Sequence, residues 1–275
     1  MTKPFNDTGS DTHTLCLFLK YMEQNEPLVS IVLPVYNASK YLKTSLESLV
    51  SQSYGNLEII IIDDASTDNS YRILSSYRKN NSRIKIYRNK KHYGLAICLN
   101  RAMKRVHGNL VTFMDARDIS VQNRIERQVA YLASHPKIAA VGTQCLHIDN
   151  YNQNLSESAF PIDHEAIQQT VYAGLSMQFE TALINRLLLP KDILKFKTNK
   201  YPLTFTEVFM HIVQYGTVAN MTDVLYYRRT SALTLIGKSK IQHVVNILKL
   251  WTKAQTHSRF SPSVRSLFVP LTKLL

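Results

Sequence analysis

The sequence predicts an α/β protein with a mostly parallel central sheet flanked by helices. From Val29 onward, short apolar runs rich in β-branched residues alternate with segments of helical periodicity. Several of these runs are apolar at nearly every position, as expected for strands buried on both faces. This alternation favours parallel strands joined by crossover helices.

Four strands are expected in the first part of the chain, along residues 29–33, 57–62, 84–87 and 110–114. Helical periods follow the first three strands, along residues 41–50, 71–77 and 95–106. Pro34 is expected to end the first strand, and Gly108 the third helix. Either Ser66 or Asp68 can cap the second helix.

Beyond residue 118 the alternation becomes less regular. A helix is expected along residues 125–132, a strand begins at 138–141, and a further helix along 208–213 ends before Gly216. Residues 142–200 contain mixed polar segments that are expected to form loops. No internal repeat or low-complexity tract is present in the sequence.

Composition and charge limit the partners of the chain. It has 33 Lys plus Arg against 20 Asp plus Glu, which gives a formal net charge of +13. Such a field attracts a nucleotide diphosphate, an anionic lipid surface or a nucleic acid, and charge alone does not choose among them. The sequence lacks an interleaved aromatic and basic motif, so a nucleic acid is not an expected partner.

The cysteines and the termini bear on the cellular location. Cys16, Cys98 and Cys145 are odd in number, widely spaced and without a Cys-x-x-Cys pair, so we interpret them as packed thiols in a reducing compartment. The N-terminal residues lack the apolar core of a signal peptide, and no apolar run approaches the ~20 residues that cross a bilayer. We expect a cytoplasmic protein, either soluble or peripheral on the inner face of the cell membrane.

Functional side chains are expected beyond the carboxyl ends of the strands, where ligands of such sheets bind. The sequence places three segments there, at residues 34–37, 63–64 and 115–118. Their aromatic ring and carboxylates suit a nucleotide, because a ring can cover the base and carboxylates can bind the base, the ribose or a cation. The glycine-rich motifs of dinucleotide dehydrogenases and P-loop NTPases are absent from the sequence.

These same residues also have plain structural interpretations, which remain open at this point. Tyr36 could be a core aromatic at a strand end, and Asp63 and Asp64 could be turn and capping carboxylates. Their joint occurrence at three strand ends favours the site.

Four stretches resemble the family 2 glycosyltransferases with the A-type glycosyltransferase fold, a Rossmann-like fold. They read VSIVLPVYNASKYLKTSLESLVSQSY, LEIIIIDDASTDNS, HYGLAICLNRAM and MDARDISVQNRIERQVAYLASHP, in the family's order and spacing. The resemblance is strong over residues 27–145 and weaker over 175–230. It implies that Pro34 and Tyr36 line the nucleobase pocket, that Asp64 hydrogen-bonds the base, and that Asp115 lies by the ribose and diphosphate.

The acidic turn departs from the pattern of the family it resembles. That turn usually reads Asp-x-Asp-Asp, and the second aspartate of the Asp-x-Asp pair coordinates Mg or Mn on the donor diphosphate. This chain has Arg117 at that position, which leaves Asp115 and Asp118 as the expected metal ligands. A guanidinium cannot bind a cation, but it can bind phosphate oxygens and replace some of the metal charge. If Arg117 takes over this role, the Mg or Mn expected for the family is dispensable in this chain.

The residues at the expected general-base position also differ from the pattern of the family. The family's helix before the Tyr-Gly turn usually begins with Glu-Asp, and its aspartate is the general base. Counting back from Gly216, Thr204 and Phe205 occupy those positions. The nearest carboxylate is Glu207, which would point about 200° away from Phe205 on an ideal helix. Glu207 is thus a compromised catalytic candidate, and a solvated glutamate at a helix start is its alternative interpretation.

We expect three parts in the chain: an N-terminal extension (1–26), a glycosyltransferase domain (27–230) and a basic C-terminal helical tail (231–275). The domain would comprise a nucleotide-binding half (27–118) and an acceptor half (119–230). The tail has apolar residues on one helical face, at positions 244, 247, 248 and 251, and could lie on an anionic membrane or pack on the domain.

The resemblance implies transfer of a sugar from a nucleotide diphosphate-sugar to an acceptor hydroxyl, with inversion. The acceptor would be a glycan or lipid-linked glycan of the cell surface. The alternative is a catalytically weakened or inactive relative that binds nucleotide or glycan and acts as a partner of an active transferase. The substitutions at Arg117 and Phe205 keep that alternative open.

Overall fold

A computed structural model describes residues 26–170, 176–197 and 203–230 of the chain. Within these residues, nine strands form one sheet in the order β3-β2-β1-β4-β8-β6-β9-β5, and β7 pairs with β6 outside this path. The strands are β1 (Val29–Val35), β2 (Leu57–Asp63), β3 (Ile84–Arg88), β4 (Leu110–Phe113), β5 (Ile119–Ser120), β6 (Ile138–Ile148), β7 (Asn154–Glu157), β8 (Leu183–Asn185) and β9 (Thr217–Arg229).

The first four strands pair in parallel, as the alternating pattern predicted. Strand β2 is buried along its whole length, because it lies between β1 and β3 and has helices above and below. The helices are α2 (Ser39–Val50), α3 (Ser70–Asn80), α4 (Leu95–Met103), α5 (Arg124–Ser134), α6 (His164–Thr170) and α7 (Leu203–Tyr215). Two short 3-10 helices, η2 (Phe179–Thr181) and η3 (Arg186–Leu188), flank β8.

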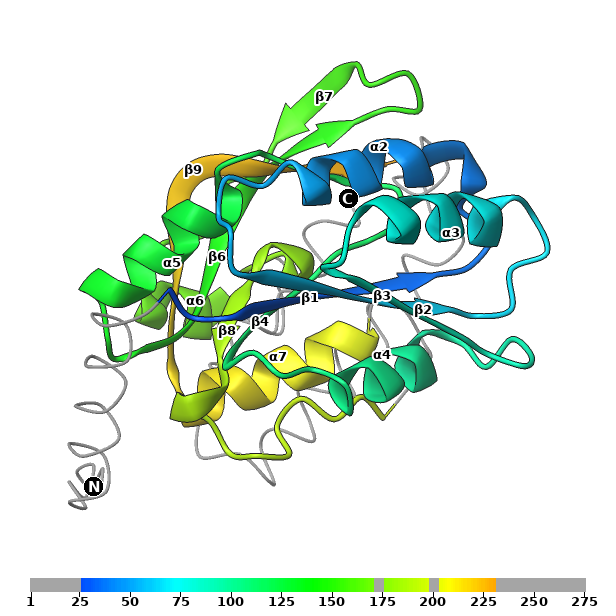
Figure 1. The fold of residues 1–275 in the computed structure, drawn as a ribbon. Coiled ribbons are helices and arrows are strands. Elements are labelled where there is room, and N and C mark those ends of the chain that lie inside the picture. The colour runs from blue at the N-terminus through cyan, green and yellow to red at the C-terminus, as the bar shows by residue number, and fades with distance from the viewer. Residues whose placement is uncertain (1–25, 171–175, 198–202, 231–275) are drawn as a thin grey trace.

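Helices cover both faces of the sheet (Figure 1). Helices α2 and α3 lie over one face, and α4 and α7 lie under the other. Each layer has its own apolar cluster: Leu42, Leu46 and Leu49 of α2 pack with one set of strand residues. Leu99 of α4 and Ile212 of α7 pack with the other set. The expected α/β architecture, with a mostly parallel central sheet between helices, is confirmed.

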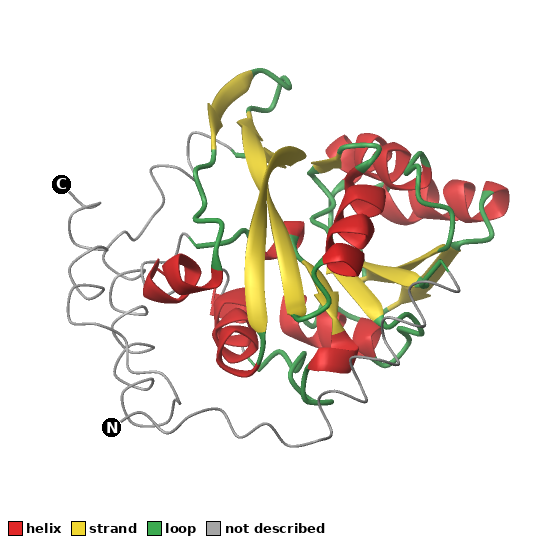
Figure 2. Cartoon of the chain, turned by 90° about the vertical axis from the view of Figure 1, so that its left-hand side faces the viewer, coloured by secondary structure: helices red, strands yellow, loops and turns green. Residues whose placement is uncertain are grey.

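The second half of the chain completes the sheet with longer strands than expected. Strands β6 and β9 run parallel side by side as a long twisted pair (Figure 2), and β8 lies antiparallel between β4 and β6. Residues 142–200 were expected to form loops, but much of this segment forms secondary structure, in β6, β7, α6 and β8. Strand β9 was missed because its burial does not alternate and its register with β6 shifts at three places.

Three element ends differ from the sequence prediction. Strand β1 continues through Pro34 to Val35, because the ladder with β4 ends at Val32 and the missing N–H of Pro34 faces that unpaired side. Helix α4 ends at Met103, and Gly108 instead precedes β4, where an added Cβ would lie 2.4 Å from the Leu28 carbonyl oxygen. Helix α7 begins at residue 203, before the expected 208.

The two cysteines in the described residues are packed thiols, as expected, and the reducing compartment stays a prediction. Cys98 and Cys145 are buried and free. Cys16 lies outside the described residues, as do the N-terminal extension up to residue 25 and the basic tail. Within the described residues, no helix is both long and apolar enough to cross a bilayer.

Candidate nucleotide site

Three of the predicted site segments meet at one edge of the sheet. Tyr36 follows β1, Asp64 follows β2, and Asp115 lies two residues beyond β4. These strands are adjacent and parallel, with Val35 paired to Asp63 in register, so their carboxyl ends lie side by side. The topology therefore assembles the side chains that the sequence placed on separate turns.

The turns after β1 and β2 are tied to each other by hydrogen bonds. Ser66 Oγ accepts from the backbone N–H of Asn37 at 3.1 Å. Asp68 accepts from the N–H of Ser39 at the start of α2 and from the N–H of Ser70 at the start of α3. Asp68 thus bonds the first residue of both helices, although Asn69 and not Asp68 or Ser66 is the N-cap of α3, and Ser66 binds the β1 turn instead. These bonds hold Tyr36 and Asp64 at fixed positions.

Asp64 is a buried carboxylate in a dense set of hydrogen bonds. It accepts from Asn89 Nδ2 at 2.5 Å and from the backbone N–H groups of Tyr93 and Gly94 at 3.0 and 2.7 Å. Burial acts to raise the pKa of Asp64, but the hydrogen bonds from Asn89, Tyr93 and Gly94 outweigh it and lower the pKa below its ordinary value. Asp64 is therefore held as an anion that accepts hydrogen bonds on both of its oxygens.

His92 joins Tyr36 to Asp64. Its ring stacks on Tyr36 with a centroid distance of 3.9 Å and an interplanar angle of 24°. Its Nδ1 lies 2.8 Å from Asp64 Oδ2. Neither His92 nor Asn89 was predicted from the sequence to be a site residue. Both residues follow β3, which is the neighbour of β2 in the sheet. This position, next to a strand that carries a site residue, was the feature of the sequence that could have identified them.

Asp115 and Arg117 form a two-pronged ion pair at the end of β4. Arg117 donates from Nε and Nη2 to the two carboxylate oxygens of Asp115, each at 3.0 Å, and its backbone N–H donates to Asp115 Oδ1 at 2.9 Å. The Arg117 side chain is half exposed. Its guanidinium thus lies at the site edge with one side engaged by Asp115.

Asp118 faces away from this pair toward β9. Tyr226 Oη donates to Asp118 Oδ2 at 2.9 Å, and the Arg229 N–H donates to Oδ1 at 2.7 Å. The side chain is buried, and burial, together with the nearby charge of Asp115, raises the pKa of Asp118 well above its ordinary value.

The two expected metal ligands therefore do not fit a divalent cation. The oxygens of Asp115 are paired with a guanidinium, and those of Asp118 are bonded within the fold. Across residues 26–170, 176–197 and 203–230, no three or more His, Cys, Asp or Glu side chains gather as a metal site. A hard cation such as Mg²⁺ needs oxygen ligands that are free to turn toward it.

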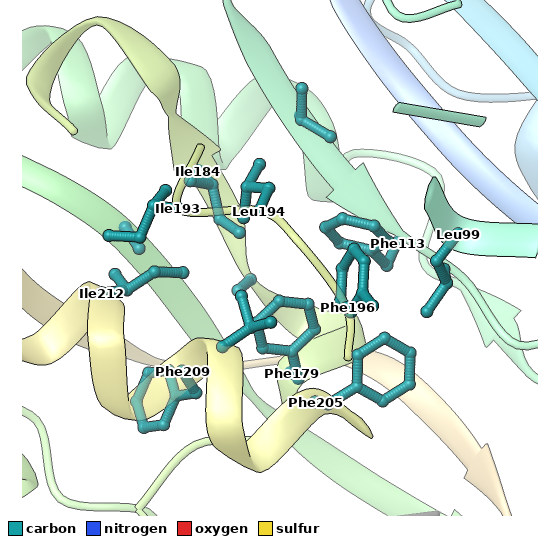
Figure 3. Packing of buried hydrophobic residues seen from close by; sticks show 14 of the residues in the cluster. Leu99, Phe113, Phe179, Ile184, Ile193, Leu194, Phe196, Phe205, Phe209 and Ile212 are labelled. Carbon is teal, nitrogen blue, oxygen red and sulfur yellow. The ribbon is translucent and has the colours of Figure 1, made fainter. Parts of the chain in front are cut away.

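The start of α7 holds a core aromatic where the resemblance expects a base. Phe205 is buried and packs with Phe113, Phe179 and Phe196 (Figure 3). Thr204 beside it is 1% exposed. Glu207 lies further along α7 and is partly buried. Its catalytic role stays a prediction.

A buried carboxylate that the sequence analysis overlooked lies nearby. Glu180 belongs to η2, between Phe179 and β8, and is 3% exposed. Burial raises its pKa, and the charge of Arg228 opposes this effect. No pattern in residues 142–200 marked it, because the segment was expected to be loop.

Comparison with known proteins finds glycosyltransferases. The chain is 40% identical over 126 residues to the putative glycosyltransferase EpsE of Bacillus subtilis, a match that covers 46% of this chain and 45% of that protein. An uncharacterized glycosyltransferase of Haemophilus influenzae is 27% identical over 231 residues, 83% of this chain and 87% of that protein. The Escherichia coli UDP-Glc:alpha-D-GlcNAc-diphosphoundecaprenol beta-1,3-glucosyltransferase WfgD is 36% identical over 106 residues, 38% and 41% of the two chains.

Solved structures share the fold at low sequence identity. TarS of S. aureus in complex with UDP-GlcNAc has a TM-score of 0.67 and 17% identity, over 90% of this chain and 71% of that chain. The mannosyltransferase PcManGT of Pyrobaculum calidifontis in complex with GDP-Man and Mn2+ has a TM-score of 0.64 and 17% identity, over 95% and 79%. The family model described as glycosyl transferase family 2 matches residues 30–191, more than half of the sequence, and the chain therefore belongs to glycosyl transferase family 2.

Proposed function

We propose that this chain transfers a sugar from a nucleotide diphosphate-sugar to an acceptor hydroxyl, and that Tyr36 and Asp64 bind the nucleobase. The observation that carries the proposal is the position of His92. A flat ring with an N–H group stacks on Tyr36 and contacts Asp64 at once. A nucleobase bound between the same two side chains would make the same two contacts. Pro34 borders this position at the end of β1.

The chemistry of Asp64 narrows the class of base. A carboxylate with a lowered pKa accepts hydrogen bonds and does not donate them. It therefore prefers a base that presents a ring N–H, as uracil and guanine do. Two structural neighbours were solved with UDP-GlcNAc and with GDP-Man, which agrees with this choice. We propose a uridine or guanosine diphosphate-sugar as the donor.

The diphosphate is proposed to lie over Asp115 and Arg117. The half-exposed guanidinium of Arg117 would donate to phosphate oxygens and balance the charge that develops on the leaving diphosphate. Because the carboxylates of Asp115 and Asp118 do not fit a cation, we propose that donor binding depends only weakly on Mg or Mn. The solved PcManGT complex contains Mn2+, so this chain would differ from that neighbour.

The proposed reaction inverts the anomeric centre in one displacement. The acceptor oxygen attacks the anomeric carbon and forms the new glycosidic bond. The bond from that carbon to the diphosphate oxygen breaks on the opposite side, and its electron pair leaves with the nucleoside diphosphate. The hydroxyl proton passes to a base, and Glu207 is the base proposed from the sequence.

We propose cell-surface polysaccharide or glycolipid assembly as the setting, because WfgD, by its name, acts on a lipid-linked sugar diphosphate. A cytoplasmic location with peripheral contact to an anionic membrane would suit such an acceptor. The basic tail after residue 230 would make this contact. Full-length protein should then sediment with anionic vesicles at low salt and be released as salt rises, while a folded chain that ends at residue 230 stays in solution.

Nucleotide binding tests the proposal directly. Calorimetry with UDP, GDP, ADP and CDP should detect binding of UDP or GDP and much weaker binding of the other two. Replacement Asp64→Ala should weaken that binding by about 1–3 kcal/mol, the cost of leaving a buried partner unsatisfied. Unchanged affinity in a folded Asp64→Ala protein would remove Asp64 from the site, and failure of all four nucleotides to bind would reject the proposal.

A second function is favoured by one specific observation, the burial of Phe205 at the expected base position. A chain without a working base would bind nucleotide or glycan and act as a partner of an active transferase. Binding of UDP or GDP without release of nucleotide from UDP-Glc, UDP-GlcNAc or GDP-Man would support this function.

A further inference from the structure

The sheet topology brings Glu180 to the same edge as Asp115. Strand β8 runs antiparallel to β4, with Thr112 paired to Leu183. Residues before β8 therefore lie beside residues after β4. Glu180 lies three residues before Leu183, in η2, and Asp115 lies three residues after Thr112, so both follow the last pair of this ladder at the same edge.

Three buried hydrogen bonds hold Glu180 and the neighbouring Thr181 in place. Arg124, which is fully buried, donates from Nη1 to the Glu180 carbonyl oxygen at 3.1 Å. Gln128 Nε2 donates to the Thr181 carbonyl oxygen at 2.8 Å, and the Thr143 N–H donates to Thr181 Oγ1 at 3.2 Å. These bonds fix the backbone of Glu180 and the neighbouring Thr181, so the point from which the Glu180 side chain extends is held in place.

Glu180 also adjoins the start of α7. The neighbouring ring of Phe179 stacks on Phe205 with a centroid distance of 4.8 Å. Phe205 occupies the position at which the family resemblance expects the catalytic aspartate. The residue next to Glu180 in η2 therefore contacts the helix that lacks the expected carboxylate.

Glu180 interacts electrostatically with charged residues, among them Asp115 at the proposed diphosphate position. Asp115 and Arg228 both act electrostatically on the Glu180 carboxyl, and Glu180 in turn acts on Asp118. Its Oε2 accepts a hydrogen bond from Gln178 Nε2. The side chain is 3% exposed, so a hydroxyl that reaches it leaves bulk water, which strengthens its interaction with the carboxylate.

We propose that Glu180 is the general base that accepts the proton of the attacking hydroxyl. This inference rests on the proposed transferase function and replaces Glu207 in that role. The hydroxyl oxygen bonds to the anomeric carbon, the diphosphate leaves with the electron pair of the broken bond, and the proton moves to a Glu180 carboxylate oxygen. Asp118 is less suited, because Tyr226 and Arg229 occupy both of its oxygens.

The test compares two isosteric variants of the full-length protein. UDP-Glc, UDP-GlcNAc and GDP-Man serve as donors, and water serves as the acceptor, so that nucleotide release reports turnover. Glu180→Gln should bind the active donor within about threefold of the unmodified protein and lower turnover at least ~100-fold, the contribution of a general base. Glu165→Gln, which removes an exposed carboxylate from α6, is the matched control and should change neither quantity.

Each other outcome has a defined meaning. Wild-type turnover in a folded Glu180→Gln protein overturns the inference and leaves the proposed function standing. Binding without turnover in the unmodified protein also overturns it, whereas no donor binding at all rejects the proposed function itself. Loss of turnover in Glu207→Gln, with turnover kept in Glu180→Gln, returns the role to Glu207.

A second variant guards against a folding defect. If Glu180→Gln does not fold, Glu180→Asp keeps the charge and withdraws the carboxylate by one methylene. Turnover should then fall at least ~10-fold with donor binding retained, because a displacement of about 1 Å is costly in catalysis. Unchanged turnover in Glu180→Asp overturns the inference.

Discussion

At the residue scale, the candidate site depends on a few side chains that bind one another in place of a ligand. His92 contacts Tyr36 and Asp64, and Arg117 binds Asp115 through two hydrogen bonds. A bound nucleotide diphosphate would compete for the same atoms. Its affinity therefore reflects the difference between the new contacts and the internal contacts that are lost.

Removal of His92 should tighten nucleotide binding. If the imidazole occupies the place of the base, then His92→Ala abolishes the competing hydrogen bond and stack, each worth about 0.5–1.5 kcal/mol. Together these amount to about 1–3 kcal/mol, so we expect UDP or GDP to bind about fivefold to 150-fold more tightly in calorimetry. His135→Ala is the control, because His135 also stacks on a tyrosine, Tyr131, but lies directly after α5. Weaker binding in His92→Ala would mean that His92 contacts the base itself.

Replacement of Arg117 should restore a need for metal. A guanidinium at this position repels a divalent cation, so UDP or GDP binding to the unmodified protein should survive EDTA. Arg117→Asp frees Asp115 and supplies the second carboxylate of an Asp-x-Asp pair. Binding to this variant should then require Mn or Mg. Abolition of nucleotide binding by EDTA in the unmodified protein would contradict the role given to Arg117.

At the element scale, the loop from β3 to α4 covers the site, and its backbone conformation depends on one glycine. Gly94 has φ 90° and ψ 168°, a region that is nearly exclusive to glycine. Its N–H donates to Asp64 at 2.7 Å, and it directly precedes α4. The conformation of Gly94 therefore couples the position of the loop to the site carboxylate.

Gly94→Ala should strain this loop. We expect a loss of about 1–3 kcal/mol in the free energy of unfolding, measured with urea, because a Cβ is strongly disfavoured at this φ and ψ. Gly55→Ala is the matched control: Gly55 is exposed, and an added Cβ meets only Glu26 Oε2, at 3.9 Å. It should change stability by less than about 0.5 kcal/mol. Equal stability of the two variants would show that the loop relaxes freely.

At the scale of the whole molecule, the opposite edge of the sheet is held together by Glu58 of β2. Its carboxylate accepts from Ser30 Oγ at 2.6 Å, the His107 N–H at 2.7 Å and Lys85 Nζ at 2.9 Å. Burial acts to raise the pKa of Glu58, but these bonds outweigh it and lower the pKa to about 2. Glu58 thus connects β1, β3 and the segment before β4.

The network around Glu58 should make stability depend on pH. Because the folded pKa of about 2 lies below the ordinary 4.5, the contribution is complete above pH 4.5 and is lost as the pH falls from 4.5 toward 2. Glu58→Gln should cost about 1–3 kcal/mol at pH 7 and progressively less over that acid range. Glu47→Gln, which removes an exposed carboxylate from α2, should cost under about 1 kcal/mol. Urea unfolding at several pH values measures both variants.

Local pattern was enough to predict the parallel half of the sheet and the residues at its edge. Buried parallel strands are apolar along their length, and the polar residues that end them mark the binding edge, so Tyr36, Asp64 and Asp115 were found together. Strand β9 and residues 142–200 were not, because strands with register shifts and short antiparallel strands lack a regular apolar pattern.

The sequence by itself determined the α/β class, the order of the elements in the first half and the family to which the chain belongs. Only the tertiary structure decided which side chains bind one another. The Asp118 carboxylate binds Tyr226, the His92 ring stacks on Tyr36, and the antiparallel pairing of β8 with β4 brings η2 to the edge that holds Asp115. Periodicity reports which face of an element is buried, whereas the partner of a buried polar group is set by strand register and by the need to satisfy each buried charge.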